Sequence, residues 1–99
     1  MFLDNARRYL GAIKGRLTPV MPGKKIVEGL EVVDAPGHTP GHIALLVSSG
    51  KETLLNAADT VHHNVLMFAH PEWTSAFDTD PKMGAETRRK VLDLSLIHI

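Results

Sequence analysis

The segment from Asp34 to His42 restricts the fold more strongly than any other part of this 99-residue chain. It reads Asp-Ala-Pro-Gly-His-Thr-Pro-Gly-His, so two prolines and two glycines fall within seven residues. Proline removes a backbone donor and breaks the interior of a helix, and this density excludes a regular helix. His38 and His42 therefore do not share one helical face, unlike the two histidines of an H-E-x-x-H helix. We expect a compact loop whose tight turns are permitted by the glycines.

Apolar and β-branched runs flank this loop on both sides and predict short strands. The run before the loop covers residues 26–33 and contains a glycine turn. The run after the loop covers residues 43–58, with a turn at residues 49–52, and this pattern is typical of a hairpin. We therefore predict mostly antiparallel strands, with the loop connecting two of them.

Helices are predicted near both ends of the chain. Apolar side chains in residues 2–13 recur with the spacing of one helical face. Asp80 can cap a second helix, whose first turn suits Pro81. The residues expected to face inward on this second helix are Met83, Thr87 and Val91, and those expected to face solvent are Arg88, Arg89 and Lys90. Together with the strands, these helices predict an α/β fold.

Charge and composition exclude several functional classes. Eleven basic residues balance eleven acidic ones, so we expect neither nucleic acid nor an anionic membrane as a partner. No apolar run approaches the roughly 18 residues of a membrane helix, and residues 1–4 lack the layout of a signal peptide, which favours a cytoplasmic chain. The absence of cysteine excludes disulfide scaffolds and cysteine-based zinc fingers. Histidine is concentrated instead, with five of six between positions 38 and 70.

His38 and Asp59 are the strongest candidates for metal ligands. His38 lies on the rigid loop, and zinc binds a neutral imidazole nitrogen of fixed direction at about 2.0–2.1 Å. Asp59 ends an apolar strand, where a carboxylate can ligate one metal ion or bridge two. The intervening hairpin returns its second strand toward the level of the loop, which favours their approach. The alternative is that both are turn residues, with Asp59 forming an Asx turn or a helix cap.

The order of these motifs resembles the middle of a metallo-β-lactamase-fold hydrolase. The matching blocks are the loop Pro36–His42, the strand pair that follows it, and Ala58–Thr60. Further blocks are similar to the branch of that superfamily that includes methyl parathion hydrolase and lactonase-like enzymes. They comprise residues 68–73, residues 77–81 and residues 87–89.

The resemblance implies a fold, a cofactor and a reaction. The fold is half of an αββα sandwich, formed by residues 1–93 as one partial domain. The cofactor is a pair of zinc ions, with His38 as a ligand of one ion and Asp59 as the bridging, catalytic carboxylate. The reaction is attack by a metal-activated hydroxide on a small-molecule ester, lactone or phosphotriester.

The chain also departs from the pattern of that superfamily. The H-x-H-x-D-H motif that supplies most metal ligands does not precede His38, and the final histidine ligand does not follow within this sequence. Only two ligands are therefore present, and we expect the isolated chain to be inactive. The first alternative is a non-catalytic metal-binding or interaction domain that retains only these two ligands. The second is a purely structural fragment.

Several other residues have weaker functional interpretations beside structural ones. His42 is expected to support the loop around the metal rather than to bind the metal. His62 follows the ligand loop closely and, with Phe68 and Phe77, is a candidate for the substrate pocket, since such pockets use aromatic side chains. The alternative for these three is an exposed histidine and ordinary packing of the aromatic rings.

Residues 94–99 read Leu-Ser-Leu-Ile-His-Ile and break off an amphipathic helix without a cap. This hexapeptide resembles the translation of a transposon-end sequencing adapter. We expect it to be a non-native tail, and we assign no function to His98.

Overall fold

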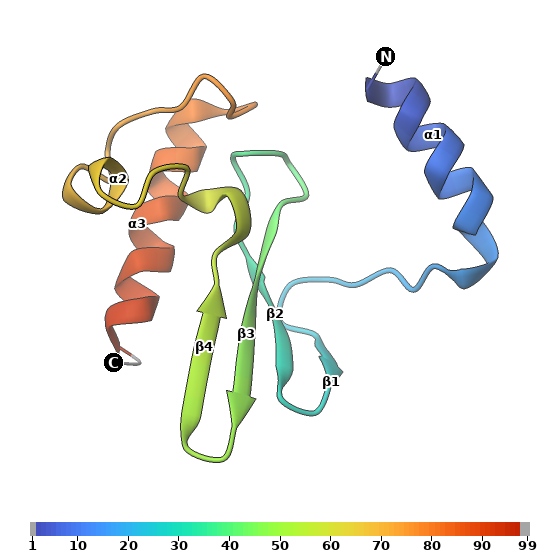
Figure 1. Cartoon of the computed structure of the whole chain (residues 1–99), viewed down its shortest axis with the longest axis horizontal. Coiled ribbons are helices and arrows are strands. Elements are labelled where there is room, and N and C mark those ends of the chain that lie inside the picture. Colours follow the sequence, from blue (N-terminus) through green and yellow to red (C-terminus); the bar gives the residue numbers. More distant parts are fainter. Residues whose placement is uncertain (1, 98–99) are drawn as a thin grey trace.

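A four-stranded antiparallel sheet forms the centre of the computed structural model, which describes residues 2–97 and the side chains of residues 2–94 (Figure 1). The strands follow one another in chain order across the sheet. They are β1 (Lys25–Val27), β2 (Leu30–Asp34), β3 (Ile43–Ser49) and β4 (Glu52–Asn56). The predicted strands and the predicted hairpin are confirmed.

Glycine determines the turn between β1 and β2. Gly29 adopts a φ of +80°, and a Cβ atom at this position would collide with the carbonyl oxygen of Ser48. The same carbonyl belongs to β3, whose Ser48 N–H donates to the Gly29 carbonyl at 2.8 Å. The close approach of the two backbones at this turn therefore requires a residue without a side chain.

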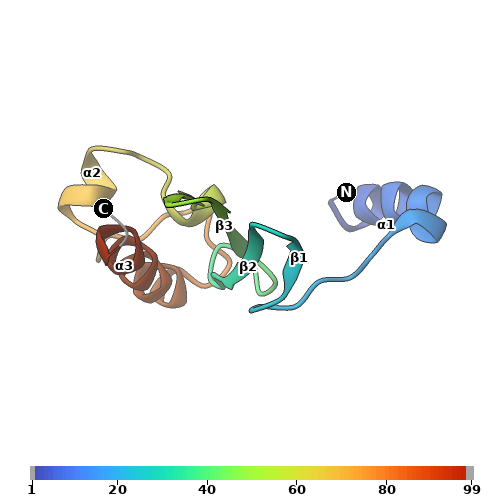
Figure 2. The ribbon, with the colours of Figure 1, turned by 90° about the horizontal axis from the view of Figure 1, so that it is seen from below.

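Helices lie on both sides of the sheet (Figures 1 and 2). The helical segments are α1 (Phe2–Ile13), η1 (Lys14–Arg16), η2 (Ala58–Thr60), α2 (Leu66–Ala69) and α3 (Pro81–Ile97). The helix α3 packs against the sheet through Val91, which forms a buried cluster with Ala35 and Ala44. Among the described helices, none combines the length and apolar character needed to cross a lipid bilayer.

The start of α3 is as predicted, but its buried face is not. The Met83 N–H donates to Asp80 Oδ1 at 3.0 Å, so Asp80 caps the helix and Pro81 begins it. Thr87 and Val91 are buried as expected, whereas Met83 is 42% exposed. The prediction for Arg88 is also wrong, because its side chain is fully buried.

The buried face of α3 differs from the predicted face because of a close contact between two backbones. Gly84 faces the loop between β2 and β3, where a Cβ atom on Gly37 would overlap the backbone of Gly84. With Gly84 inward, the residues one and two turns later are brought inward as well. Arg88 follows Gly84 by four positions and is buried on the same face, whereas Met83 lies outside this face and is 42% exposed.

The N-terminal helix forms where its apolar pattern predicts, but none of its residues is buried. Phe2, Tyr9 and Leu10 are all mostly exposed. Figures 1 and 2 both show α1 standing apart from the sheet, at the side opposite α3. A hydrophobic period predicts which side chains share a face, but it does not supply the surface that covers this face.

The backbone of α3 continues through Ile97, so the first part of the suspected tail is helical. His98 and Ile99 lie outside the described residues. The interpretation of residues 94–99 as a non-native tail stays a prediction.

Candidate metal centre

The loop that carries His38 is fixed from two directions. Within the loop, the N–H groups of Gly37 and His42 both donate to the Thr39 carbonyl. From outside, the segment before α3 donates through Thr79 N–H to the His38 carbonyl at 3.0 Å and through Asp80 N–H to the Gly37 carbonyl at 2.9 Å. This bonding holds the backbone of His38 in one orientation.

His42 connects this loop to Asp59. Its Nδ1 donates to the Ala35 carbonyl at 2.7 Å, since a carbonyl oxygen only accepts. Its Nε2 then carries the lone pair and accepts the Asp59 N–H at 3.1 Å. Both ring nitrogens are therefore engaged within the protein, which is the arrangement expected of a residue that supports the loop.

The hairpin brings Asp59 beside His38. Asp59 lies in η2, directly after β4, and the backbone reaches it through Ala58 at a φ of +47°, which is uncommon for a residue with a side chain. The Asp59 Oδ2 atom lies 3.6 Å from His38 Nε2, and the Asp59 side chain is 67% exposed. The two candidate ligands therefore face each other at an open edge.

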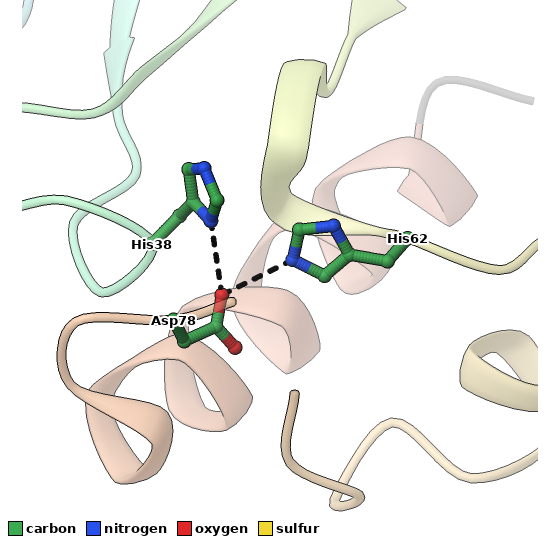
Figure 3. Close-up of side chains that lie close together, drawn as sticks. All are labelled: His38, His62 and Asp78. Carbon is green, nitrogen blue, oxygen red and sulfur yellow. Dashed lines mark hydrogen bonds and ion pairs between the residues drawn. The ribbon is translucent and has the colours of Figure 1, made fainter. Parts of the chain in front are cut away.

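The other nitrogen of His38 faces the carboxylate of Asp78, which no sequence pattern marked as a site residue. His38 Nδ1 lies 3.2 Å from Asp78 Oδ1, and His62 Nε2 lies 3.1 Å from the same oxygen. Figure 3 shows the two imidazoles converging on this oxygen from separate segments. Asp78 was visible in the sequence only inside one of the blocks of the resemblance, because a single aspartate before a helix has no periodic signal.

Arg88 lies beneath this carboxylate and binds three different segments. Its Nε donates to the Thr60 carbonyl at 2.8 Å, next to Asp59. Another of its nitrogens donates to the carbonyls of Pro71 at 2.9 Å and Trp73 at 2.6 Å. A third nitrogen lies 3.5 Å from Asp78 Oδ2, and both side chains are almost completely buried.

The proposed pocket residues are placed differently from one another. The ring centroid of His62 lies 5.9 Å from that of Phe77, which is 78% exposed. Phe68 lies on α2 and is 57% exposed. The side chain that α2 directs toward His62 is instead the buried Met67, whose sulfur accepts the His62 N–H at 3.3 Å.

The geometry of His38 and Asp59 fits a zinc ion. Two atoms that are each about 2.0–2.1 Å from a tetrahedral zinc lie about 3.4 Å apart, close to the 3.6 Å between His38 Nε2 and Asp59 Oδ2. The nitrogen and carboxylate donors are also of the types that zinc accepts. A second grouping is possible, since one ligand atom from each of His38, His62 and Asp78 lies within 4.8 Å of the others.

Several chains of solved structures are similar to this chain, and two of them are hydrolases of informative description. No protein-family model and no curated protein sequence matches the chain. One structure is of AidC, a dizinc quorum-quenching lactonase in complex with the product N-hexnoyl-L-homoserine, with a TM-score of 0.84 and 34% identity over 92% of this chain. The other is of the hydrolase AbOPH in the β-lactamase superfamily, with a TM-score of 0.79 and 29% identity over 88% of this chain.

The chain has part of a metallo-β-lactamase fold. It spans 31% of the AidC chain and 30% of the AbOPH chain. The predicted fold class is therefore confirmed, as a sheet with flanking helices that corresponds to a portion of a larger domain. Both of these structures are hydrolases, which supports the hydrolase resemblance without distinguishing its branches.

Proposed function

We propose that this chain is part of a zinc-dependent hydrolase that acts on an ester, lactone or phosphotriester. The observation that carries this proposal is the distance of 3.6 Å between His38 Nε2 and Asp59 Oδ2, at an edge where the carboxylate is open to solvent. The dizinc lactonase of similar fold supports the choice of metal and of reaction class. We further propose that residues 1–93 belong to one domain of this hydrolase.

Each residue of the centre has a separate task in this proposal. His38 presents a nitrogen ligand, and Asp59 presents a carboxylate that two ions can share. His42 fixes the backbone of Asp59 through the hydrogen bond to its N–H. When bound, zinc supplies an activated water near neutral pH and stabilises the negative charge that develops on the substrate.

We propose a small molecule with an apolar portion as the substrate. His62 and the exposed Phe77 form a polar and an apolar surface close to the ligands. The product described with AidC is an acylated homoserine, which favours a lactone among the three classes. A phosphotriester is the choice that similarity to methyl parathion hydrolase favours. Phe68 belongs to this pocket only if the substrate extends as far as α2.

The test is to measure zinc content and turnover of the full-length gene product and its variants. We expect His38→Ala and Asp59→Asn each to reduce bound zinc and to abolish hydrolysis of a lactone, an aryl ester and a phosphotriester. The matched control is His70→Ala, because the contacts of the His70 ring are with Glu72 and Trp73 rather than with His38 or Asp59. Unchanged zinc content in both site variants would overturn the proposal.

The same assay separates a second candidate function. This second candidate is a non-catalytic metal-binding domain, which would use the same pair, His38 and Asp59. It predicts zinc that depends on His38 and Asp59, with no turnover of any of the three substrate classes.

A further inference from the structure

We propose that Asp78, held by Arg88, positions the imidazoles of His38 and His62 and is not itself a metal ligand. The proposal concerns the residues behind the candidate centre rather than the ligands of the centre. It rests on the proposed function only where it assigns His38 Nε2 to the metal.

The first argument is the chemistry of a shared oxygen. Asp78 Oδ1 lies 3.2 Å from His38 Nδ1 and 3.1 Å from His62 Nε2. An ionised carboxylate oxygen only accepts hydrogen bonds, so each facing nitrogen carries a hydrogen. His38 is therefore the Nδ1–H tautomer, and His62 is the Nε2–H tautomer.

The tautomer determines which nitrogen of His38 can bind a metal. A neutral imidazole has one nitrogen lone pair, and in the Nδ1–H form this lone pair is on Nε2. His38 Nε2 is the atom that faces Asp59 at 3.6 Å. The nitrogen of His38 that faces Asp78 is Nδ1, so a metal ion held between these two side chains would bind Nδ1 instead. The two arrangements require opposite tautomers of the same residue.

The second argument is that the surroundings of the Asp78 side chain exclude water. This side chain is 1% exposed, and the space between it, His38 and Arg88 is too narrow for a water molecule. On the other side, a Cβ atom on Gly84 would lie 2.8 Å from Asp78 Oδ2, so the backbone of α3 packs against the carboxylate. A catalytic zinc site keeps an open coordination position, and this closed environment suits a supporting carboxylate better.

The third argument is charge. A carboxylate that is removed from water needs a partner, and the guanidinium of Arg88 lies 3.5 Å from Asp78 Oδ2. Because Arg88 also donates to three backbone carbonyls, it fixes Asp78 relative to Thr60 and the segment after α2. Asp78 is therefore a rigid acceptor for both imidazoles.

The hydrogen bond to Asp78 also determines which ring nitrogen of His62 is the donor and which is the acceptor. Its Nε2–H is bound to Asp78, so its Nδ1 remains as the acceptor nitrogen. The ring centroid of His62 lies 5.1 Å from that of His38, and its side chain is 19% exposed. His62 is thus presented beside the ligand residues as a hydrogen-bond acceptor of fixed tautomer.

The first experiment requires no substitution and no metal. Long-range ¹H–¹⁵N correlation spectra of the full-length protein, labelled at histidine and metal-free at about pH 8, report which nitrogen of each neutral imidazole carries hydrogen. We expect Nδ1–H for His38 and Nε2–H for His62. An Nε2–H form of His38 would overturn the proposal. Because the protein is free of metal, this result stands even if the proposed hydrolase function fails.

The second experiment separates a positioning carboxylate from a ligand. Asp78→Asn keeps the shape of the side chain but can present an N–H to the imidazoles. We expect this variant to retain the unmodified number of zinc ions per chain, with affinity weakened about 10–100-fold. The matched control is Asp93→Asn, an exposed aspartate on α3 that should leave affinity unchanged. Loss of a whole zinc ion in Asp78→Asn would overturn the proposal.

Discussion

At the scale of single residues, buried polar contacts around Arg88 and Asp78 hold the candidate centre together. Arg88 joins η2, the segment after α2 and Asp78, which lie 10 to 28 positions before it in the sequence. A basic residue in a run of three is usually solvated, and the pattern around position 88 predicted that outcome wrongly. Arg88 is buried because its hydrogen-bond partners come from other elements. The sequence around position 88 does not reveal those partners.

Substitution of Arg88 should therefore be strongly destabilising. In Arg88→Met the side chain keeps an apolar stem but loses every donor, so three backbone carbonyls and the Oδ2 atom of Asp78 lose their charged donor. We expect the free energy of unfolding to fall by about 3–5 kcal/mol, as for other broken buried ion pairs. Urea denaturation measures this change, with the exposed neighbour Arg89→Met as the control. Equal effects of the two substitutions would contradict the assignment.

The pKa of the Glu72 carboxyl allows a second prediction at the scale of single residues. Its pKa is lowered chiefly by a hydrogen bond from its own backbone, with smaller effects from His70 and Arg89. We expect His70→Ala to move this pKa only slightly upward, since the main cause stays in place. A carboxyl with a lowered pKa favours the folded state above its unfolded pKa and loses that effect as the pH falls through the folded pKa. A ¹³C NMR titration of the Glu72 carboxyl checks both the direction and the small size of the change.

At the scale of elements, the contact between the His38 loop and α3 decides which face of the helix is buried. Gly37 has a φ of +129°, and any Cβ there would overlap the backbone of Gly84. The loop sequence predicted tight turns, but not that one of its glycines would be a helix contact. The amphipathic pattern of α3 alone gave Met83 a buried position, because the periodicity of a helix does not reveal where another backbone approaches.

Gly37→Ala should separate the loop from α3 and weaken the candidate metal site at the same time. The backbone strain alone is expected to cost about 1–3 kcal/mol, and the overlap with Gly84 adds to it. Gly41→Ala is the matched control in the same loop, because a Cβ there meets nothing within 4 Å. Thermal unfolding and zinc affinity of the two variants test this expectation. It fails if Gly37→Ala and Gly41→Ala behave alike.

At the scale of the whole molecule, the chain is more open than a closed domain of its size. Its accessible surface is 7601 Å², compared with about 5,500 Å² expected for a compact monomer of this mass. Its radius of gyration is 15.0 Å, compared with about 13 Å for a compact domain of 100 residues. Leu54 on the sheet and Phe2 on α1 are among the large apolar side chains that remain exposed.

This exposure predicts association of the 99-residue chain when it is produced by itself. We expect it to bind a hydrophobic dye and to form oligomers as its concentration rises, because apolar patches of this kind are rarely left open in soluble monomers. Light scattering after size-exclusion chromatography measures this, with Leu54→Lys expected to reduce the association. A stable monomer with a radius of gyration near that of a compact domain would contradict the prediction.

Local sequence determined the elements of this protein and the positions of its two candidate ligands. The strands follow from β-branched runs, the turn at Gly29 from a residue that tolerates positive φ, and the start of α3 from Asp80 and Pro81, all of which act within a few residues. Only the tertiary structure decided that Asp78 faces His38 and His62, that Arg88 is buried and that α1 stands uncovered. Each of these depends on groups far apart in the chain, whose approach is set by packing rather than by local preference.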